Sequence, residues 1–294
     1  MAAYAHPEAI VSTAWLAANL GDPKLRIFDC STYLLYETGT GRPYRIESGR
    51  ADYDQGHIPG AGFLDVSKDL SDPHSAVAFT MPSPQQFATI MARHGVSDDS
   101  TVVLYNKGFP MWATRVWWML RSIGFENVAV LDGGYEKWKK EGRPTTAEVK
   151  RHAPGTLTAR PRADMWVDKN AMLEVVEGKG PVTVNALSPA IYSGEKNQYG
   201  RAGHLPGTYN VFYGDLLDPT TGEFLPPEKL RPLFAQCGAL ESERVIAYCG
   251  GGISATMDAL AMLVCGQDKV AIYDGSMSEW VKDPALPLKL GMEP

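Results

Sequence analysis

Two stretches of the sequence, TVVLYNKG (residues 101–108) and RVIAYCGG (residues 244–251), share one pattern: an apolar run, a tyrosine, an asparagine or cysteine, and then glycine. Asn106 in the first stretch stands where Cys249 stands in the second, 143 positions later (249 − 106). Short apolar, β-branched runs of this kind are typical of buried strands in a parallel sheet. The two stretches therefore indicate two copies of one strand-and-loop unit.

Two further pairs of motifs recur in the same order. GHIPGA (residues 56–61) returns as GHLPGT (residues 203–208), and the histidines of the two motifs are 147 positions apart (204 − 57). VAVLDGGYEKW (residues 128–138) returns as VAIYDGSMSEW (residues 270–280), and their tryptophans are 142 positions apart (280 − 138). Self-similarity at a nearly constant spacing is the signature of a repeated structural unit. The sequence therefore predicts a tandem duplication.

The length and composition of the chain agree with two domains. The chain has 294 residues, of which 44% are hydrophobic and 21% charged, and a single globular domain usually has about 100–150 residues. Residues 143–162 contain three prolines and no periodic apolar pattern, which is typical of a linker. We expect a first domain at residues 8–143, a linker at residues 144–162 and a second domain at residues 163–291.

Both halves alternate apolar runs with helical patterns. The runs predicted as buried strands are LRIF, TVVLY and VAVL in the first half and PVTV, RVIAY and KVAIY in the second. Ser12 and Thr13 are placed to cap a helix over AWLAANL, and Ser83 precedes PQQFATIMARHG, which ends on a glycine. This alternation predicts an α/β fold in which helices cover both faces of a parallel sheet.

The loop that begins at Cys249 is the expected site of chemistry, because ligands of open parallel sheets bind beyond the carboxyl ends of the strands. Three glycines follow the cysteine, and a helical stretch follows them. Glycines let a loop curl with its N–H groups inward, and such a loop at a helix N-terminus attracts anions and stabilises a thiolate. The matching first-half loop at residues 106–111 lacks the thiol and the run of glycines. The sequence therefore predicts one nucleophile, Cys249, in the second domain.

Composition argues against several other classes of protein. Cys30, Cys237 and Cys265 form no Cys-x-x-Cys pair with Cys249, so we expect no zinc site, no disulfide framework and no cofactor. A net charge of −6 without a basic run argues against binding to nucleic acid. No apolar stretch is long enough to span a membrane, and the first residues lack the features of a secretory signal. We therefore expect a cytoplasmic protein that acts on small molecules.

Five segments in a fixed order resemble the tandem-domain rhodanese and 3-mercaptopyruvate sulfurtransferase family. They are residues 11–31, 56–61, 114–138, 248–260 and 272–288, so the resemblance covers nearly the whole chain. It implies two tandem rhodanese-like domains, each a doubly wound, mostly parallel five-stranded sheet, with the active site between them. It also implies that the first domain is inactive, because Asn106 takes the place of the cysteine.

The resemblance implies a sulfurtransferase mechanism as well. Cys249 would take sulfur from thiosulfate, or from 3-mercaptopyruvate, as a persulfide and pass it to cyanide or a thiol acceptor, which is a form of covalent catalysis. The backbone amides of the loop would hold the charge of the persulfide. The loop residues expected to bind the donor are Gly250, Gly251, Gly252, Ile253, Ser254 and Ala255.

This sequence departs from the family where the charged end of the donor is held. Relatives that prefer thiosulfate carry basic residues at the positions of Gly250 and Gly251, and relatives that prefer mercaptopyruvate carry a serine at the second of these positions. Leu187 stands where the family has an arginine that holds the donor. With backbone amides left as the main anion binders, we expect the small, compact thiosulfate to be the better donor.

Four other residues are candidates for the donor site. Arg201 lies just before the second histidine motif, and Arg45 and Arg50 precede the first. His57 is included because the corresponding histidine of mercaptopyruvate-type relatives is discussed as part of a proton relay. His204 holds the same place in the other half, so a hydrogen bond that fixes a turn explains both histidines better than a proton relay.

Two other functions compete with sulfur transfer. Phosphatases that share this fold need a Cys-x5-Arg loop to grip phosphate, and residue 255 is alanine, so this function is excluded. A non-catalytic tandem module that binds or regulates a partner remains the alternative. A binding module would explain why Leu187 replaces the arginine that holds the donor in the family. It would not explain why a cysteine and its glycines occur in one copy only. Asp132 and Asp274, which begin the two DG turns, are expected to cap those turns.

Overall fold

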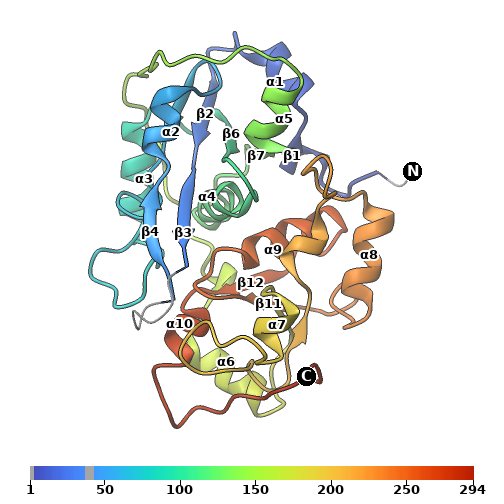
Figure 1. Ribbon diagram of the computed structural model, residues 1–294. Coiled ribbons are helices and arrows are strands. Elements are labelled where there is room, and N and C mark those ends of the chain that lie inside the picture. Colours follow the sequence, from blue (N-terminus) through green and yellow to red (C-terminus); the bar gives the residue numbers. More distant parts are fainter. Residues whose placement is uncertain (1–2, 37–42) are drawn as a thin grey trace.

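The computed structural model describes residues 3–36 and 43–294, and it consists of two α/β halves (Figure 1). The first half contains β1 (Ile10–Val11), α1 (Thr13–Asn19), β2 (Leu25–Asp29), β3 (Thr32–Leu35), β4 (Arg45–Ser48), α2 (Arg50–Gln55), β5 (Ala61–Phe63), α3 (Pro84–Arg93), β6 (Thr101–Tyr105), α4 (Met111–Ser122), β7 (Val128–Leu131) and α5 (Gly134–Lys140). The second contains β8 (Trp166–Val167), α6 (Lys169–Val176), β9 (Val182–Asn185), α7 (Pro189–Tyr192), β10 (Tyr209–Asn210), α8 (Pro227–Ala235), β11 (Val245–Tyr248), α9 (Ala255–Val264), β12 (Val270–Tyr273) and α10 (Ser276–Trp280).

Each half is built on one five-stranded sheet. The strand order is β1-β7-β6-β2-β5 in the first sheet and β10-β9-β11-β12-β8 in the second, and every pair within them is parallel. Numbered along its own half, each sheet has the order 1-5-4-2-3, so the two halves share one topology. The predicted fold, two tandem domains with mostly parallel five-stranded sheets, is therefore confirmed.

The predicted strands and helix starts occur where the sequence placed them. All residues of β7, β11 and β12 are buried, as expected for strands covered on both faces. The Ser12 hydroxyl accepts a hydrogen bond from the Trp15 amide, 3.0 Å away, at the start of α1. At the start of α3, Ser83 and Gln86 form a capping box. None of the helices in the described ranges has the length and apolar character needed to cross a membrane.

The two halves pack against each other through the buried helices α4 and α9 (Figure 1). The Oγ1 atoms of Thr114 on α4 and Thr256 on α9 lie 2.8 Å apart and share a hydrogen bond. The two residues are 142 positions apart, which is the spacing of the repeat at the two tryptophans. The duplicated halves therefore meet at equivalent positions.

Asp132 and Asp274, which follow β7 and β12, bond across the same interface. Asp132 Oδ1 accepts a hydrogen bond from the Phe224 amide at 2.8 Å, and Asp274 Oδ2 accepts one from the Met81 amide at 2.8 Å. Each carboxylate thus holds a loop of the opposite half. The expectation that they only cap their own turns was incomplete, because a sequence does not show which distant segment lies over a strand end.

The two histidine motifs have the same structural role in both halves. The His57 ring is buried, with Nδ1 2.8 Å from the Tyr53 carbonyl oxygen and Nε2 3.1 Å from that of Glu148. The backbone of His57 also pairs with Thr146, in the segment that follows the first domain. His204 makes the corresponding contacts in the second half. Each histidine therefore fastens the segment that leaves its domain.

Two segments interrupt the repeat. Tyr53 and Tyr192 are equivalent, since each stacks on the histidine of its half. Tyr53 lies 24 positions after Asp29, at the end of β2, whereas Tyr192 lies 7 positions after Asn185, at the end of β9. This longer segment contains the antiparallel pair of strands β3 and β4. The second half has its additional residues after Tyr192, where residues 193–203 contain no helix or strand.

Candidate active site

Cys249 lies directly after β11 and before the N-terminus of α9, at the carboxyl edge of the second sheet. The residue is 2% exposed and lines a cavity of about 200 Å³. Both halves contribute to this cavity. Its walls are Leu34, Tyr36, Tyr44, Phe79 and Met111 from the first half, and Leu187, Ser188, Ile191, Lys196, Gln198, Tyr199, Phe212, Tyr213, Cys249, Gly250, Gly251, Ile253 and Ser254 from the second.

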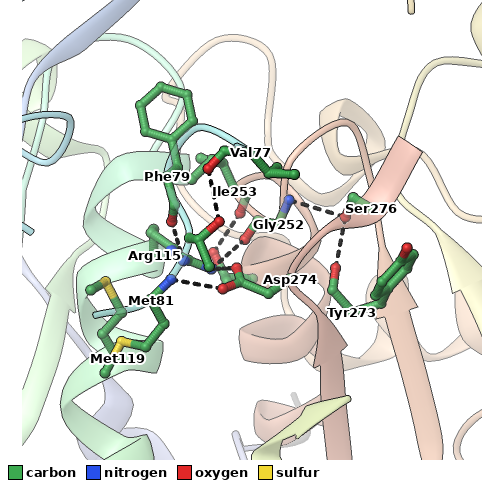
Figure 2. A network of polar contacts seen from close by, with 12 residues as sticks. Val77, Phe79, Met81, Arg115, Met119, Gly252, Ile253, Tyr273, Asp274 and Ser276 are labelled. Atoms are coloured by element: carbon green, nitrogen blue, oxygen red, sulfur yellow. Dashed lines mark hydrogen bonds and ion pairs between the residues drawn. The ribbon is translucent and has the colours of Figure 1, made fainter. Parts of the chain in front are cut away.

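The hydroxyl group of Ser276 holds both ends of the turn that begins at Cys249. Ser276 Oγ accepts hydrogen bonds from the Cys249 amide at 3.1 Å and from the Gly252 amide at 3.0 Å. It donates its own proton to the Tyr273 carbonyl oxygen at 2.8 Å. Figure 2 shows the bonds that join Ser276 to Gly252 and to Tyr273. One buried side chain therefore sets the curvature of the loop.

Ser276 adopts a strained backbone conformation to do this. Its φ angle is +47°, in the left-handed region that side chains other than glycine rarely occupy. The equivalent residue of the first half, 142 positions earlier, is Gly134 with a φ angle of +57°. The copy without the cysteine thus has the unstrained residue, and the copy with Cys249 has a serine. Strain that persists in this way is typical of functional sites.

Most of the backbone N–H groups around Cys249 have no hydrogen-bond acceptor among the described residues. Within the described chain, the N–H groups of Gly250, Gly251, Ile253, Ser254 and Ala255 donate to no other backbone or side-chain group. They lie at the N-terminus of the ten-residue helix α9, where the helix dipole favours negative charge. The loop can therefore hold an anion next to the Cys249 sulfur. The Gly252 amide, which we had expected to join them, is bonded to Ser276 instead.

Arg115 on α4 ties this loop to the first half (Figure 2). Its side chain is fully buried, and Nη1 donates to the Gly252 carbonyl oxygen at 3.1 Å and to Asp274 Oδ1 at 2.7 Å. Nη2 donates to the carbonyl oxygen of Phe79, a residue that lines the cavity. The other oxygen of Asp274 holds the Met81 amide. A single guanidinium group thus positions the cysteine loop and the cavity wall together.

The corresponding loop of the first half has no nucleophile. The Asn106 side chain occupies it, accepting a hydrogen bond from the Ala113 amide at 3.0 Å and donating to the Phe109 carbonyl oxygen at 2.7 Å. A cavity of about 410 Å³ lies beside this loop, and its described lining residues include no cysteine. Among the described residues, the structure therefore places a cysteine, Cys249, in the cavity that both halves line, and an asparagine at the equivalent position of the first half.

A comparison with known proteins agrees with this arrangement. The Rhodanese-like domain family matches residues 12–141 and 193–283. The chain belongs to the rhodanese family. It is 34% identical to the "Sulfur carrier protein TtuD" of Thermus thermophilus, over 99% of each chain, and 34% identical to a thiosulfate sulfurtransferase of Rattus norvegicus, over 93% of this chain and 92% of the relative.

A solved structure supports the same assignment. The crystal structure of SseA from Escherichia coli, described as a 3-mercaptopyruvate sulfotransferase, superposes with a TM-score of 0.77 at 29% identity and covers 91% of this chain and 98% of that one. The predicted family and the predicted enzyme class, a sulfurtransferase, are therefore confirmed.

The arginines proposed for the donor site lie outside the described lining of the cavity. Both ends of the Arg201 guanidinium group are engaged, with Nη1 2.8 Å from the Asp283 carbonyl oxygen and Nη2 2.7 Å from that of Leu286. Arg50 pairs with Asp54 at 2.8 Å. These side chains hold their own segments of the rhodanese domains, and the geometry gives no support to a donor contact by either.

His57 is also absent from the cavity, because both of its ring nitrogens face backbone carbonyl groups in the first half. The role that the sequence favoured, a hydrogen bond that fixes a turn, agrees with these contacts. Arg45 pairs with Glu47 at 3.1 Å. Ala255 is fully buried at the start of α9, so only its amide is available to the loop.

The residues that line the cavity without having been singled out by the sequence include Lys196, Tyr44 and Tyr199. Lys196 is the one charged side chain among the described lining residues, and its ammonium group lies 5.6 Å from the centre of the Tyr36 ring. Tyr44 and Tyr199 stand over the cysteine loop. These three residues come from the two segments that interrupt the repeat, so a comparison of the two copies could have drawn attention to these segments.

Proposed function

We propose that this rhodanese-family chain transfers sulfur through a persulfide on Cys249, from thiosulfate or 3-mercaptopyruvate to cyanide or a thiol. The observation that carries the proposal is the position of Cys249 in a cavity shared by the two halves. Most backbone amides of its loop donate a hydrogen bond to no other described group. The sulfurtransferase names of relatives that cover nearly the whole chain support it.

The chemistry divides into two displacements. The Cys249 thiolate attacks the outer sulfur of thiosulfate, a new S–S bond forms, and the old S–S bond breaks so that sulfite leaves with the electron pair. Cyanide then attacks the outer sulfur of the persulfide, thiocyanate leaves, and the thiolate is regenerated. The negative charge stays beside residues 249–255 throughout, so fixed amide dipoles can stabilise both steps.

Lys196 supports binding of an anionic donor. Backbone amides were expected to be the main anion binders in this site, because Leu187 takes the place of the family's arginine. The ammonium group of Lys196 supplies a positive charge in the same cavity, which Leu187 also lines. A charged hydrogen bond contributes about 1.5–3 kcal/mol, so Lys196 compensates in part for the missing arginine. We retain thiosulfate as the first donor to test.

Steady-state assays with thiosulfate and 3-mercaptopyruvate in parallel, using cyanide as the acceptor and thiocyanate as the readout, test this function. The wild-type protein should turn over at least one donor, Cys249→Ser should be inactive, and Cys265→Ser should keep its activity, since Cys265 follows the far end of α9. Equal activity of the wild type and Cys249→Ser would contradict the proposal. No turnover of either donor would favour the non-catalytic binding module.

A further inference from the structure

The phenol of Tyr199 occupies the space beside the first glycine after the cysteine. A Cβ atom added at Gly250 would lie 1.8 Å from Tyr199 Oη and 2.4 Å from its Cζ, so any larger residue at position 250 would collide with the ring. In this chain the hydroxyl group of Tyr199, from another segment, therefore fills the space that a side chain at position 250 would occupy.

A second phenol approaches the next glycine. A Cβ atom added at Gly251 would lie 3.8 Å from Tyr44 Oη, which is van der Waals distance. Tyr44 precedes β4 of the first half, whereas Tyr199 belongs to residues 193–203 of the second. Tyrosine hydroxyl groups from both halves therefore lie beside the two glycines, and Ser278 Oγ lies as close to the Cβ position of Gly251 as Tyr44 Oη does.

The segments that supply these tyrosines hold each other in place. Gln198 Nε2 donates a hydrogen bond to the Pro43 carbonyl oxygen at 2.7 Å, which joins the residue before Tyr199 to the residue before Tyr44. These segments are the two that interrupt the repeat. The parts of the chain that depart from the duplicated pattern thus meet above Cys249.

Both phenols are neutral hydrogen-bond donors at neutral pH. Burial, together with the charge on Cys249, raises the pKa of Tyr44 to about 12 and raises the pKa of Tyr199 well above its usual value. The Tyr199 hydroxyl forms no hydrogen bond with another described residue. Tyr199 is partly exposed, and its hydroxyl group is not among the fully buried atoms that lack a partner, so this hydroxyl can donate to a ligand in the cavity that Tyr199 lines.

We propose that the hydroxyl group of Tyr199, with Tyr44 beside it, holds the sulfur donor and the persulfide over Cys249 in place of side chains at positions 250 and 251. The assignment rests on the proposed function. A persulfide extends the cysteine by an S–S bond of about 2.05 Å, and the cavity is the space that this outer sulfur enters. Recognition by phenols suits a ligand with sulfur or oxygen acceptors and does not require a full positive charge at the loop.

Single-turnover loading of the full-length protein tests this assignment. The rate of persulfide formation, measured by rapid quenching and intact mass, should be recorded against thiosulfate and 3-mercaptopyruvate concentration for the wild type and for Tyr199→Phe. We expect the apparent second-order rate constant of Tyr199→Phe to fall about tenfold or more with at least one donor, as for one lost hydrogen bond to a charged group. Tyr209→Phe is the matched control, because Tyr209 is 37% exposed on β10 and lies outside the described cavity lining.

A second variant tests the same contact without altering the phenol. Gly250→Ala should displace the Tyr199 ring and slow loading, whereas Gly21→Ala should not, since a Cβ atom at Gly21 meets nothing within 4 Å. Loading of Tyr199→Phe and Gly250→Ala within twofold of the wild type would overturn the role of Tyr199 and leave sulfur transfer intact. A wild-type protein that acquires no sulfur on Cys249 would overturn the proposed function itself, and with it the role of Tyr199.

Discussion

Thr114 and Thr256 occupy equivalent positions in the two halves, and their hydroxyl groups share a hydrogen bond of 2.8 Å at the centre of the α4–α9 contact. Each hydroxyl also lies close to a carbonyl oxygen of its own helix or loop, that of Met111 for Thr114 and that of Ile253 for Thr256. Ile253 belongs to the cysteine loop. The contact between the halves therefore continues directly into the loop that begins at Cys249.

Valine at either threonine should destabilise the protein because it leaves the partner hydroxyl buried with fewer acceptors. We expect Thr114→Val and Thr256→Val each to lower the free energy of unfolding by about 1 kcal/mol. The double variant should lose less free energy of unfolding than the two single variants together, because it removes both hydroxyl groups and leaves neither without its partner. Urea unfolding of the four proteins measures this coupling, and strictly additive losses would show that the two hydroxyl groups do not interact.

Substitutions of Ser276 separate the effect of its hydroxyl group from that of its backbone strain. Ser276→Ala and Ser276→Gly both remove the acceptor for the Cys249 and Gly252 amides. Both variants should therefore slow sulfur transfer about tenfold or more, because the loop loses its fixed curvature. Only glycine relieves the φ angle of +47°, so Ser276→Gly should be more stable than Ser276→Ala by about 1 kcal/mol.

Thermal unfolding and steady-state rates of the two Ser276 variants give both quantities. Wild-type sulfur transfer by Ser276→Gly would show that the hydroxyl group is not needed. Equal stability of the two variants would show that the left-handed backbone stores no strain.

We expect Asp258 on α9 to make the stability of the fold decrease as the pH rises above about 4. The residue is fully buried, neither carboxyl oxygen has a described partner, and burial raises its pKa well above the usual value, with a further increase from the charge on Cys249. The folded state therefore binds a proton that the unfolded chain releases above about pH 4. From that pH up to the folded-state pKa, this group lowers the stability by up to about 1.4 kcal/mol per pH unit.

Asp258→Asn should remove this loss and be more stable than the wild type at pH 8, with a smaller difference at pH 5. Asp268→Asn is the control, because Asp268 is exposed. Urea unfolding at both pH values gives the comparison. The same pH dependence in Asp258→Asn and in the wild type would contradict a neutral, buried carboxyl group.

Much of the fold could be predicted from the sequence because the chain contains two copies of one unit, which can be compared with each other. The paired motifs around His57 and His204 showed the duplication, and the apolar runs before Asn106 and Cys249 showed the buried strands. The contrast between Asn106 and Cys249 also drew attention to the loop after β11, which lines the cavity between the halves. A further contrast, Gly134 against Ser276, was equally visible, but its meaning depends on a φ angle that only the structure gives.

The walls of the cavity could not be predicted in the same way. Tyr44, Lys196 and Tyr199 lie in segments without a counterpart in the other half and without a periodic pattern, so nothing in the sequence indicated that they meet above Cys249. Arg201 was chosen for its charge and its place before a histidine motif. Charge alone did not show that two carbonyl oxygens already hold its guanidinium group.

The mass of the protein after incubation with thiosulfate tests the central claim most directly. A persulfide adds one sulfur atom, about 32 Da, and we expect this increase in the wild type and in the serine variants of Cys30, Cys237 and Cys265. Cys249→Ser should acquire no sulfur, and cyanide should remove the added mass from the other proteins and release thiocyanate. An unchanged mass for the wild type with both thiosulfate and 3-mercaptopyruvate, or sulfur on another cysteine of Cys249→Ser, would contradict a persulfide carried by Cys249.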